Sequence, residues 1–176
     1  GEVTRLRDTD GDGTADRYEC LATGWPQSAN YHEFTFNLTP WRGRLWFTTS
    51  VPLRGGLTNY VPGTDGDFTT PDGPGSLWSI APGGGDLRRE ARGFRTPNGM
   101  GRGVDGELFV CDNQGGWMPA SRLDRIVPAD RSGTAPAPLP FYGHQERRDA
   151  RERMEPLVAW FPHGEIGNSP SQPVLV

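Results

Sequence analysis

The chain has 176 residues, including 25 glycines, 17 prolines, 8 phenylalanines, 6 tryptophans and 4 tyrosines. So many aromatic side chains exclude a disordered chain, and the glycines and prolines therefore indicate turns between many short strands. A net charge of −4 and the absence of lysine argue against nucleic-acid binding and exclude lysine-based catalysis. The apolar runs are far shorter than the roughly 20 residues that span a bilayer, so we expect no membrane span.

The first strand pattern covers residues 3–7 and leads into an acidic loop at residues 8–19, D-T-D-G-D-G-T-A-D-R-Y-E. This loop fills each ligand position of the calcium-loop template, with a glycine at its turn. The predicted metal ligands are Asp8, Asp10, Asp12, the Thr14 carbonyl, Asp16 and Glu19. Because the flanks are strand-like, we expect a structural Ca²⁺ site between two strands. The alternative is a solvated hairpin turn that binds no metal.

Further strand patterns follow along the chain, and one helical pattern lies near its end. The strand patterns cover residues 34–38, 44–50, 76–80, 107–111 and 122–127. Each is short and bounded by Gly, Pro, Asn or Asp, which is typical of antiparallel strands joined by tight turns. Residues 145–157 form a charged helical pattern that Pro156 ends, and this pattern predicts a short helix on the surface. The predicted fold class is all-β.

Similar segments indicate an internal repeat. Residues 77–82 (LWSIAP) and 123–128 (LDRIVP) share Leu, Ile and Pro at an offset of 46 residues, and the first strand begins a shorter third copy. Residues 43–49 (GRLWFTT) match residues 106–112 (GELFVCD) in the same way. A period near 45 residues is typical of a β-propeller blade of four strands. We therefore expect residues 1–176 to form a partial β-propeller domain of about three to four blades; a closed four-bladed ring and a β-sandwich are the alternatives.

Two polar residues stand at positions where a strand end could present them to a pocket. His32 lies directly before the strand pattern at 34–38, and a histidine there can act as a general base. Arg95 precedes a Pro-Asn-Gly turn, which could hold its guanidinium at the mouth of a strand to meet an anionic group. The alternatives are a hydrogen-bonded structural histidine and an exposed loop arginine.

The order of the motifs carries more information than any one of them. In sequence order they are H-E-F-T-F, G-R-L-W-F-T-T, G-F-R-T-P-N-G-M-G, D-G-E-L-F-V-C-D-N-Q-G, L-D-R-I and F-Y-G-H. This order, over roughly residues 3–175, resembles the glucose/sorbosone dehydrogenase family of six-bladed β-propellers. It looks most similar to the secreted, dehydrogenase-like branch of aquatic bacteria. The resemblance implies a fragment of a larger propeller and a periplasmic or secreted location.

The resemblance also implies a chemistry and roles for particular residues. It implies a dehydrogenase that uses pyrroloquinoline quinone (PQQ) and Ca²⁺ to oxidise a sugar or a related alcohol or aldehyde. His32 corresponds to the base that removes the hydroxyl proton while hydride passes to the quinone. Arg95 corresponds to the arginine that contacts cofactor and substrate, although Thr96 stands where the family has Asn. Asp112 and Asn113 correspond to the segment that supplies calcium oxygens near the quinone.

The departures from the family leave a second function open. The arginines that clamp the quinone in the family's last blades have no counterpart in this sequence, so we expect this chain alone not to form the whole site. No haem attachment motif is present, so a cytochrome electron acceptor would lie on another domain or chain. The alternative is a non-catalytic, calcium-stabilised propeller that binds carbohydrate or a protein partner through aromatic residues such as Trp41 and Trp117.

The two cysteines, Cys20 and Cys111, stand too far apart in the sequence for a CxxC or zinc-ribbon motif. We expect two buried free thiols, and a disulfide between them is the alternative. Neither reading assigns the cysteines a catalytic role.

Overall fold

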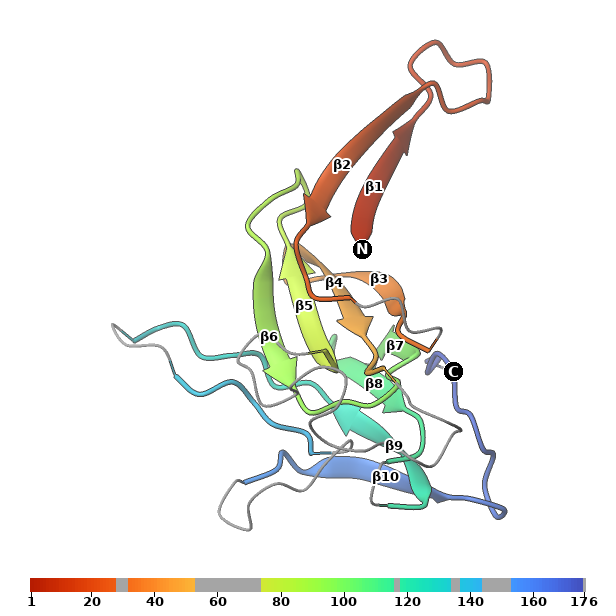
Figure 1. Cartoon of the computed structure of the whole chain (residues 1–176), viewed down its shortest axis with the longest axis vertical. Coiled ribbons are helices and arrows are strands. Elements are labelled where there is room, and N and C mark those ends of the chain that lie inside the picture. Colours follow the sequence, from red (N-terminus) through yellow and green to blue (C-terminus); the bar gives the residue numbers. More distant parts are fainter. Residues whose placement is uncertain (28–31, 53–73, 116–117, 134–136, 144–152, 176) are drawn as a thin grey trace.

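The structure is a computed structural model that describes residues 1–27, 32–52, 74–115, 118–133, 137–143 and 153–175 (Figure 1). Every regular element within these ranges is a β-strand, which confirms the predicted all-β class. The described part of the chain therefore holds no helix able to cross a membrane. The strands are β1 (Glu2–Arg7), β2 (Arg17–Thr23), β3 (Thr35–Trp41), β4 (Arg44–Thr49), β5 (Ser76–Ile80), β6 (Arg88–Arg92), β7 (Gly99–Arg102), β8 (Leu108–Asp112), β9 (Ala120–Arg125) and β10 (Leu157–Pro162).

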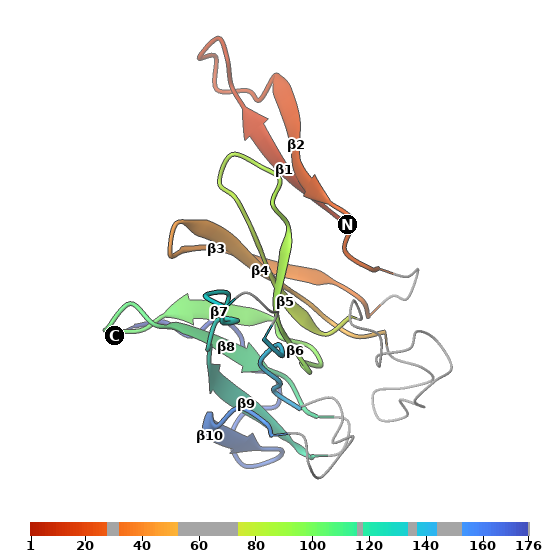
Figure 2. The same cartoon turned by 90° about the vertical axis from the view of Figure 1, so that its left-hand side faces the viewer.

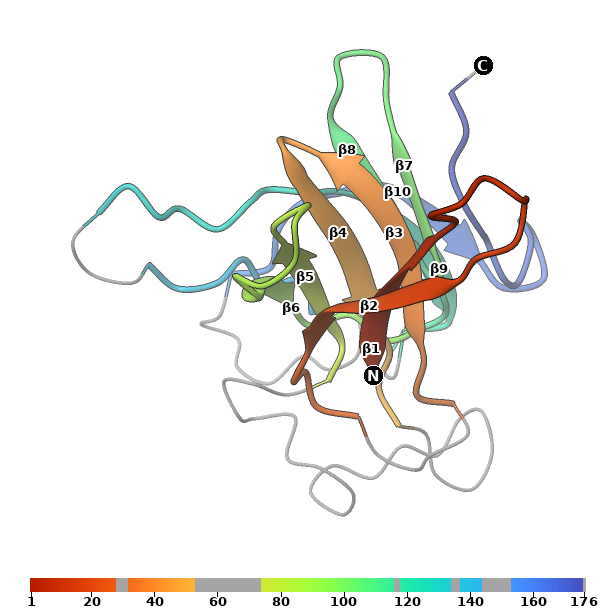
Figure 3. The ribbon, with the colours of Figure 1, turned by 90° about the horizontal axis from the view of Figure 1, so that it is seen from above.

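The strands form three antiparallel sheets in which consecutive strands are neighbours. The hairpin sheet holds β1 and β2, the middle sheet holds β3 to β6, and the end sheet holds β7 to β10. In Figures 1 and 2 the middle sheet lies between the hairpin sheet and the end sheet. None of the three sheets closes on itself, and seen from above the strands of successive sheets cross at an angle (Figure 3).

The predicted repeat matches equivalent strands of the two four-stranded sheets. The segments at 77–80 and 123–125 lie in β5 and β9, which are each the third strand of their sheet. Gly43 and Gly106 occupy the turns before the second strands, with φ of 71° and 72°. Positive φ of this size suits glycine, which explains why both copies carry it at this position. The repeat therefore reflects two sheets of the same construction.

Two clusters of apolar side chains fill the spaces between successive sheets. One cluster, between the middle and end sheets, includes Trp46 and Leu77, while the other, toward the hairpin sheet, includes Phe47 and Trp78. Neighbouring residues of β4 and of β5 thus enter different clusters, because side chains alternate across a strand. Full burial of one large apolar side chain contributes roughly 1.5–3 kcal/mol. The central strands β4 and β5 therefore carry consecutive apolar residues, because both of their faces are buried.

Two segments outside the sheets cover parts of them. Residues 137–143 return to the outer edge of the middle sheet, where Arg92 and Phe141 form a parallel bridge. The Arg92 N–H donates to the Pro140 carbonyl over 3.0 Å, so this contact shields an edge strand. Near the C-terminus, Ser171 and Pro173 lie against β7 so closely that they occupy the space where side chains of its glycines would stand.

The structure corrects several expectations. Of the expected helix at 145–157, residues 145–152 lie outside the described residues, whereas 153–156 form no helix and β10 begins at Leu157. The helix therefore does not extend to Pro156, because the apolar end of that pattern pairs with β9. Both cysteines are free, as expected, but Cys20, in β2 of the hairpin, is exposed and only Cys111 is buried.

Candidate functional site

The backbone carbonyls of the two predicted catalytic residues accept hydrogen bonds from two adjacent residues just after β4. The Ser50 hydroxyl donates to the carbonyl of His32, before β3, over 2.8 Å. The Val51 N–H donates to the carbonyl of Arg95, after β6, over 2.9 Å. His32 and Arg95 are distant in sequence, but the fold anchors both at one end of the middle sheet. His32 is partly buried, and Arg95 is buried with about 5% of its surface exposed.

Asp112, the last residue of β8, holds the backbone of the Arg95 loop. One of its carboxylate oxygens accepts the Arg95 N–H over 2.8 Å, and the other accepts the Thr96 N–H over 2.7 Å. The side chain is fully buried, where such charge-assisted hydrogen bonds are strong. Burial lowers the pKa of the Arg95 guanidinium, and the charge of Asp112 acts in the opposite direction. Asp112 therefore positions the loop, and the cofactor contact expected from the sequence stays a prediction.

The same loop is also fixed from the middle sheet. The Pro97 carbonyl accepts hydrogen bonds from the Thr48 hydroxyl over 2.6 Å and from the Asn37 amide over 3.3 Å. Asn37 adopts a φ of 63°, a conformation that asparagine tolerates better than most residues. Side chains from β3, β4 and β8 thus hold one short loop, which restricts the positions that Arg95 and Asn98 can take.

Two asparagines at this loop carry buried amide oxygens. The backbone N–H groups of Asn98 and Asn113 both donate to the Thr96 carbonyl, over 2.9 Å and 3.2 Å. Within the described residues, the Oδ1 atom of each side chain is buried and has no hydrogen-bond partner. Such oxygens accept N–H or O–H donors or coordinate cations. The sequence analysis named Asn113 as a candidate site residue but not Asn98. The position of Asn98 in the Pro-Asn-Gly turn after Arg95 could have indicated it.

At the tip of the hairpin sheet, three of the predicted metal ligands lie together. Carboxylate oxygens of Asp8, Asp10 and Asp12 are within 4.8 Å of one another, and all three residues are exposed. The Asp8 carboxylate accepts N–H groups from Gly13 over 2.8 Å and from Gly11 over 2.6 Å. These hydrogen bonds lower the pKa of the Asp8 carboxyl, so it is ionised at neutral pH. The tip therefore offers three acidic groups to a cation.

Of the other three predicted ligands, Asp16 and Glu19 are paired with residues outside this cluster. Both carboxylate oxygens of Asp16 accept hydrogen bonds from Thr9, and the Thr14 N–H donates to Asp12 over 2.7 Å. Glu19 stands in β2, where Arg5 donates to it over 2.6 Å and Arg17 over 2.8 Å. The hydrogen bond from Arg5 is the largest cause of the lowered pKa of Glu19. The sequence missed this arrangement because β2 begins at Arg17, inside the 12-residue template.

Of the two aromatic residues named for a contact surface, the structure describes only Trp41. Trp41 is buried, and its indole N–H donates to the Gly106 carbonyl of the end sheet over 2.6 Å. It therefore joins two sheets instead of facing solvent. Trp117 lies outside the described residues.

Comparisons of the chain with protein-family models, with curated proteins and with solved structures find no match. The chemistry at the strand ends is thus defined by its own side chains. They comprise a buried guanidinium, a histidine and two amide oxygens with no hydrogen-bond partner among the described residues. This set can bind an anionic group and several hydroxyl groups.

Proposed function

We propose that the chain forms part of a β-propeller dehydrogenase that oxidises a sugar or a related alcohol or aldehyde at the strand ends. The observation that carries this proposal is the attachment of His32 and Arg95 to adjacent residues, Ser50 and Val51. The resemblance implies that these two residues act together. A fold that anchors both at one strand end is the arrangement that such a role requires.

The propeller itself is part of the proposal. The four-stranded sheets repeat one construction, each is a meander, and successive sheets pack face to face. These are the properties of consecutive propeller blades. The hairpin sheet, whose Val3 enters the cluster facing the middle sheet, takes the place of the outer half of a further blade.

The side chains of the site fit parts of the expected cofactors. PQQ carries carboxylates, and the buried guanidinium of Arg95 is suited to bind one of them. The amide oxygens of Asn98 and Asn113 are suited to Ca²⁺ or to substrate hydroxyls. The bound quinone would accept the hydride. His32 would accept the hydroxyl proton, and the hydrogen bond from the Arg95 N–H to the Asp112 carboxylate would keep the Arg95 backbone in place.

An activity assay with a matched control tests this function. The full-length protein is incubated with PQQ and Ca²⁺, and reduction of a dye is followed with a panel of aldoses and aldehydes. We expect turnover in the wild type, a loss of at least about 100-fold on His32→Ala, and little change on His163→Ala, which alters a histidine after β10. Absence of turnover in the wild type, or turnover unaffected by His32→Ala, contradicts the proposal. A positive result leads to the search for the cytochrome that receives the electrons.

A second candidate is a non-catalytic, calcium-stabilised propeller that binds carbohydrate or a protein partner. The convergence of Asp8, Asp10 and Asp12 at the hairpin tip favours it, because three carboxylates suit a hard cation. A weak site of this kind suits a periplasmic or secreted protein, whose surroundings supply calcium. This candidate predicts a calcium-dependent stability without any dye reduction, which separates it from the dehydrogenase.

A further inference from the structure

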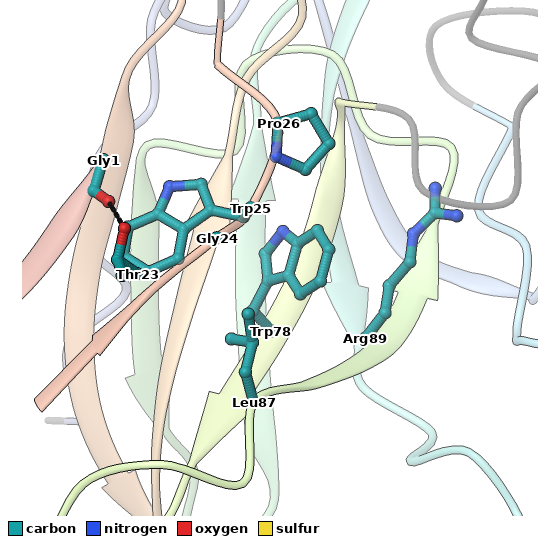
Figure 4. Close-up of a pocket in the computed structure, with 8 residues that line it drawn as sticks. All are labelled: Gly1, Thr23, Gly24, Trp25, Pro26, Trp78, Leu87 and Arg89. Carbon is teal, nitrogen blue, oxygen red and sulfur yellow. Dashed lines mark hydrogen bonds between the residues drawn. The ribbon is translucent and has the colours of Figure 1, made fainter.

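The hairpin sheet and the end sheet each turn one face away from the middle sheet, and no other sheet among the described residues covers these two faces (Figures 1 and 2). Where sheets do meet, they bury apolar side chains. At the junction of the hairpin and middle sheets, Trp25 and Trp78 lie beside each other and are almost fully buried (Figure 4). The two outward faces are therefore the places where a further sheet could pack.

The hairpin outer face is formed by Leu6 of β1 and Tyr18 of β2. These residues lie directly opposite each other in the pairing of the two strands, so their side chains share a face. Val3 enters the cluster toward the middle sheet, and Leu6, three positions further along β1, points to the opposite face. Leu6 and Tyr18 are 59% and 68% exposed.

The internal repeat shows that the other sheets bury the position of Leu6. The repeat aligns Leu6 with Ile80 and Ile126, whose side chains are 0% and 4% exposed. Each isoleucine packs toward the preceding sheet, Ile80 toward the hairpin and Ile126 toward the middle sheet. Leu6 is therefore exposed because the described residues place no sheet before the hairpin.

The end-sheet outer face, formed by Phe109 of β8 and Leu123 of β9, shows the same feature at the other end of the stack. The repeat aligns Phe109 with Trp46 and Leu123 with Leu77. Trp46 and Leu77 are almost fully buried, because the end sheet packs on them. Phe109 and Leu123 are only partly buried. The two outward faces thus correspond to the two sides of the junction between the middle and end sheets.

Residues 171–175 already occupy one strand position on the end-sheet side. Gly99 and Gly101 of β7, against which this segment lies, alternate with Met100, which enters the cluster toward the middle sheet. The segment therefore covers the outward face of β7, whereas β3 contacts β7 from the other side. It stands in the position of the first strand of a next sheet. The hairpin corresponds to a third and a fourth strand, because the repeat aligns β1 with β5 and β9.

We propose that two copies of this chain form a closed head-to-tail dimer, in which the hairpin outer face of each copy packs on the end-sheet outer face of the other. The hairpin of one copy then lies beside residues 171–175 of its partner in a composite sheet, whose second strand the described residues do not supply. Two copies hold four complete and two composite sheets, within the typical range of about 4–8 propeller blades. One copy or three copies fall outside this range, and closure of the ring covers both outer faces. The proposal rests on the propeller of the proposed function.

The mass of the particle that the 176-residue chain forms in solution tests this proposal. Light scattering during size-exclusion chromatography should give twice the 19.3 kDa of one chain. Leu6→Glu and Leu123→Glu each bury a charge in one of the two faces, so each should weaken dimerisation at least about tenfold. A mixed dimer of the two variants keeps one junction unaltered. The mixture should therefore dimerise at least about tenfold more tightly than either variant alone.

The control is Val104→Glu, which adds the same charge at an exposed apolar residue in the turn before β8, outside both faces, and should leave the dimer unchanged. A particle of one chain, an assembly larger than two chains, or a dimer that withstands both Leu6→Glu and Leu123→Glu would each overturn the proposal. The mass of the wild type remains decisive if a variant fails to fold. Because the mass depends on neither cofactor nor turnover, failure of the dimer and failure of the dehydrogenase are separate results.

Discussion

Asp112 is the residue on which the geometry of the proposed site depends most. It is fully buried and satisfies two backbone N–H groups, those of Arg95 and Thr96. Asp112→Ala removes the acceptor of one buried and one partly buried N–H group, and we expect a loss of about 3 kcal/mol in the free energy of unfolding. Urea unfolding measures this, with Asp105→Ala in an exposed turn as the control. If the free energies of unfolding of the two variants differ by less than about 0.5 kcal/mol, Asp112 does not hold the loop as described.

The two thiols should differ in reactivity. Burial, followed by the charges of Asp124 and Asp112, raises the pKa of the Cys111 thiol to about 11. Cys20 is exposed. We expect a chromogenic disulfide reagent at pH 8 to label Cys20 in the native protein and Cys111 only after unfolding. Equal labelling rates for the two cysteines in the native state would be inconsistent with the structure.

The raised pKa of Cys111 also has a consequence for stability. The unfolded chain releases the thiol proton near its usual pKa of 9.0, whereas the folded chain keeps it until about pH 11. Stability should therefore fall as the pH rises from about 9 to 11, because the folded state binds more protons in this range. Unfolding measured across this pH range in the wild type and in Cys111→Ser separates this contribution from that of other groups.

At the scale of elements, the hairpin tip is the predicted calcium site. Because Asp16 and Glu19 have other partners, we expect a weak site, with a Kd on the order of 0.1–1 mM. About 10 mM Ca²⁺ should then stabilise the wild type by about 1–3 kcal/mol. We expect Asp10→Ala to abolish the rise in melting temperature with calcium. Glu19→Gln should retain that rise, because Glu19 pairs with arginines.

If the melting curve of the wild type is identical in calcium and in chelator, the prediction of a calcium site is wrong and the segment is an ordinary acidic turn. Loss of the calcium response in Glu19→Gln would instead support the full template expected from the sequence. The two variants thus distinguish a site of three carboxylates from the larger ligand set.

The contact between β7 and the C-terminal segment gives a second prediction at this scale. A side chain at Gly101 would overlap the Pro173 carbonyl, because the segment lies directly on the glycine. Gly101→Ala should therefore displace residues 171–175 or cost about 1–3 kcal/mol. Limited proteolysis should cut this segment faster in Gly101→Ala than in Arg102→Ala, which alters an exposed neighbour. Equal cleavage rates would show that the contact is not present in solution.

The sequence patterns do not predict β6 and β7, because a local pattern carries no information about the strands that pair with them. Gly99–Arg102 contains two glycines and Arg88–Arg92 contains three arginines, so neither has the apolar alternation of a strand. They are strands because they pair with apolar neighbours, a tertiary effect that overrides propensity. The patterns at 44–50, 76–80 and 107–111 were recognised because buried faces make them apolar. Likewise His32 and Arg95 could be selected from the sequence, but the burial of the Asn98 amide oxygen depends on contacts across sheets.

At the scale of the whole molecule, three sheets pack in sequence order, and the proposed strand-end site lies where two of them meet. Asp112, at the end of β8 in the end sheet, holds the loop that leads from the middle sheet to the end sheet. The internal repeat predicted the two equivalent sheets, since it matched β5 with β9. The sequence also predicts a strand on each side of the acidic loop, but it does not predict that the second strand begins at Arg17, inside the 12-residue template.

The central claim is that the strand ends around Arg95 bind a quinone, and equilibrium binding of PQQ in the presence of Ca²⁺ tests it most directly. Titration of the full-length protein should show saturable binding. Arg95→Gln should weaken that binding at least about tenfold, and Arg102→Gln, at an exposed arginine of β7, should not. No binding of PQQ by the wild type, or equal affinity in Arg95→Gln, would contradict the account.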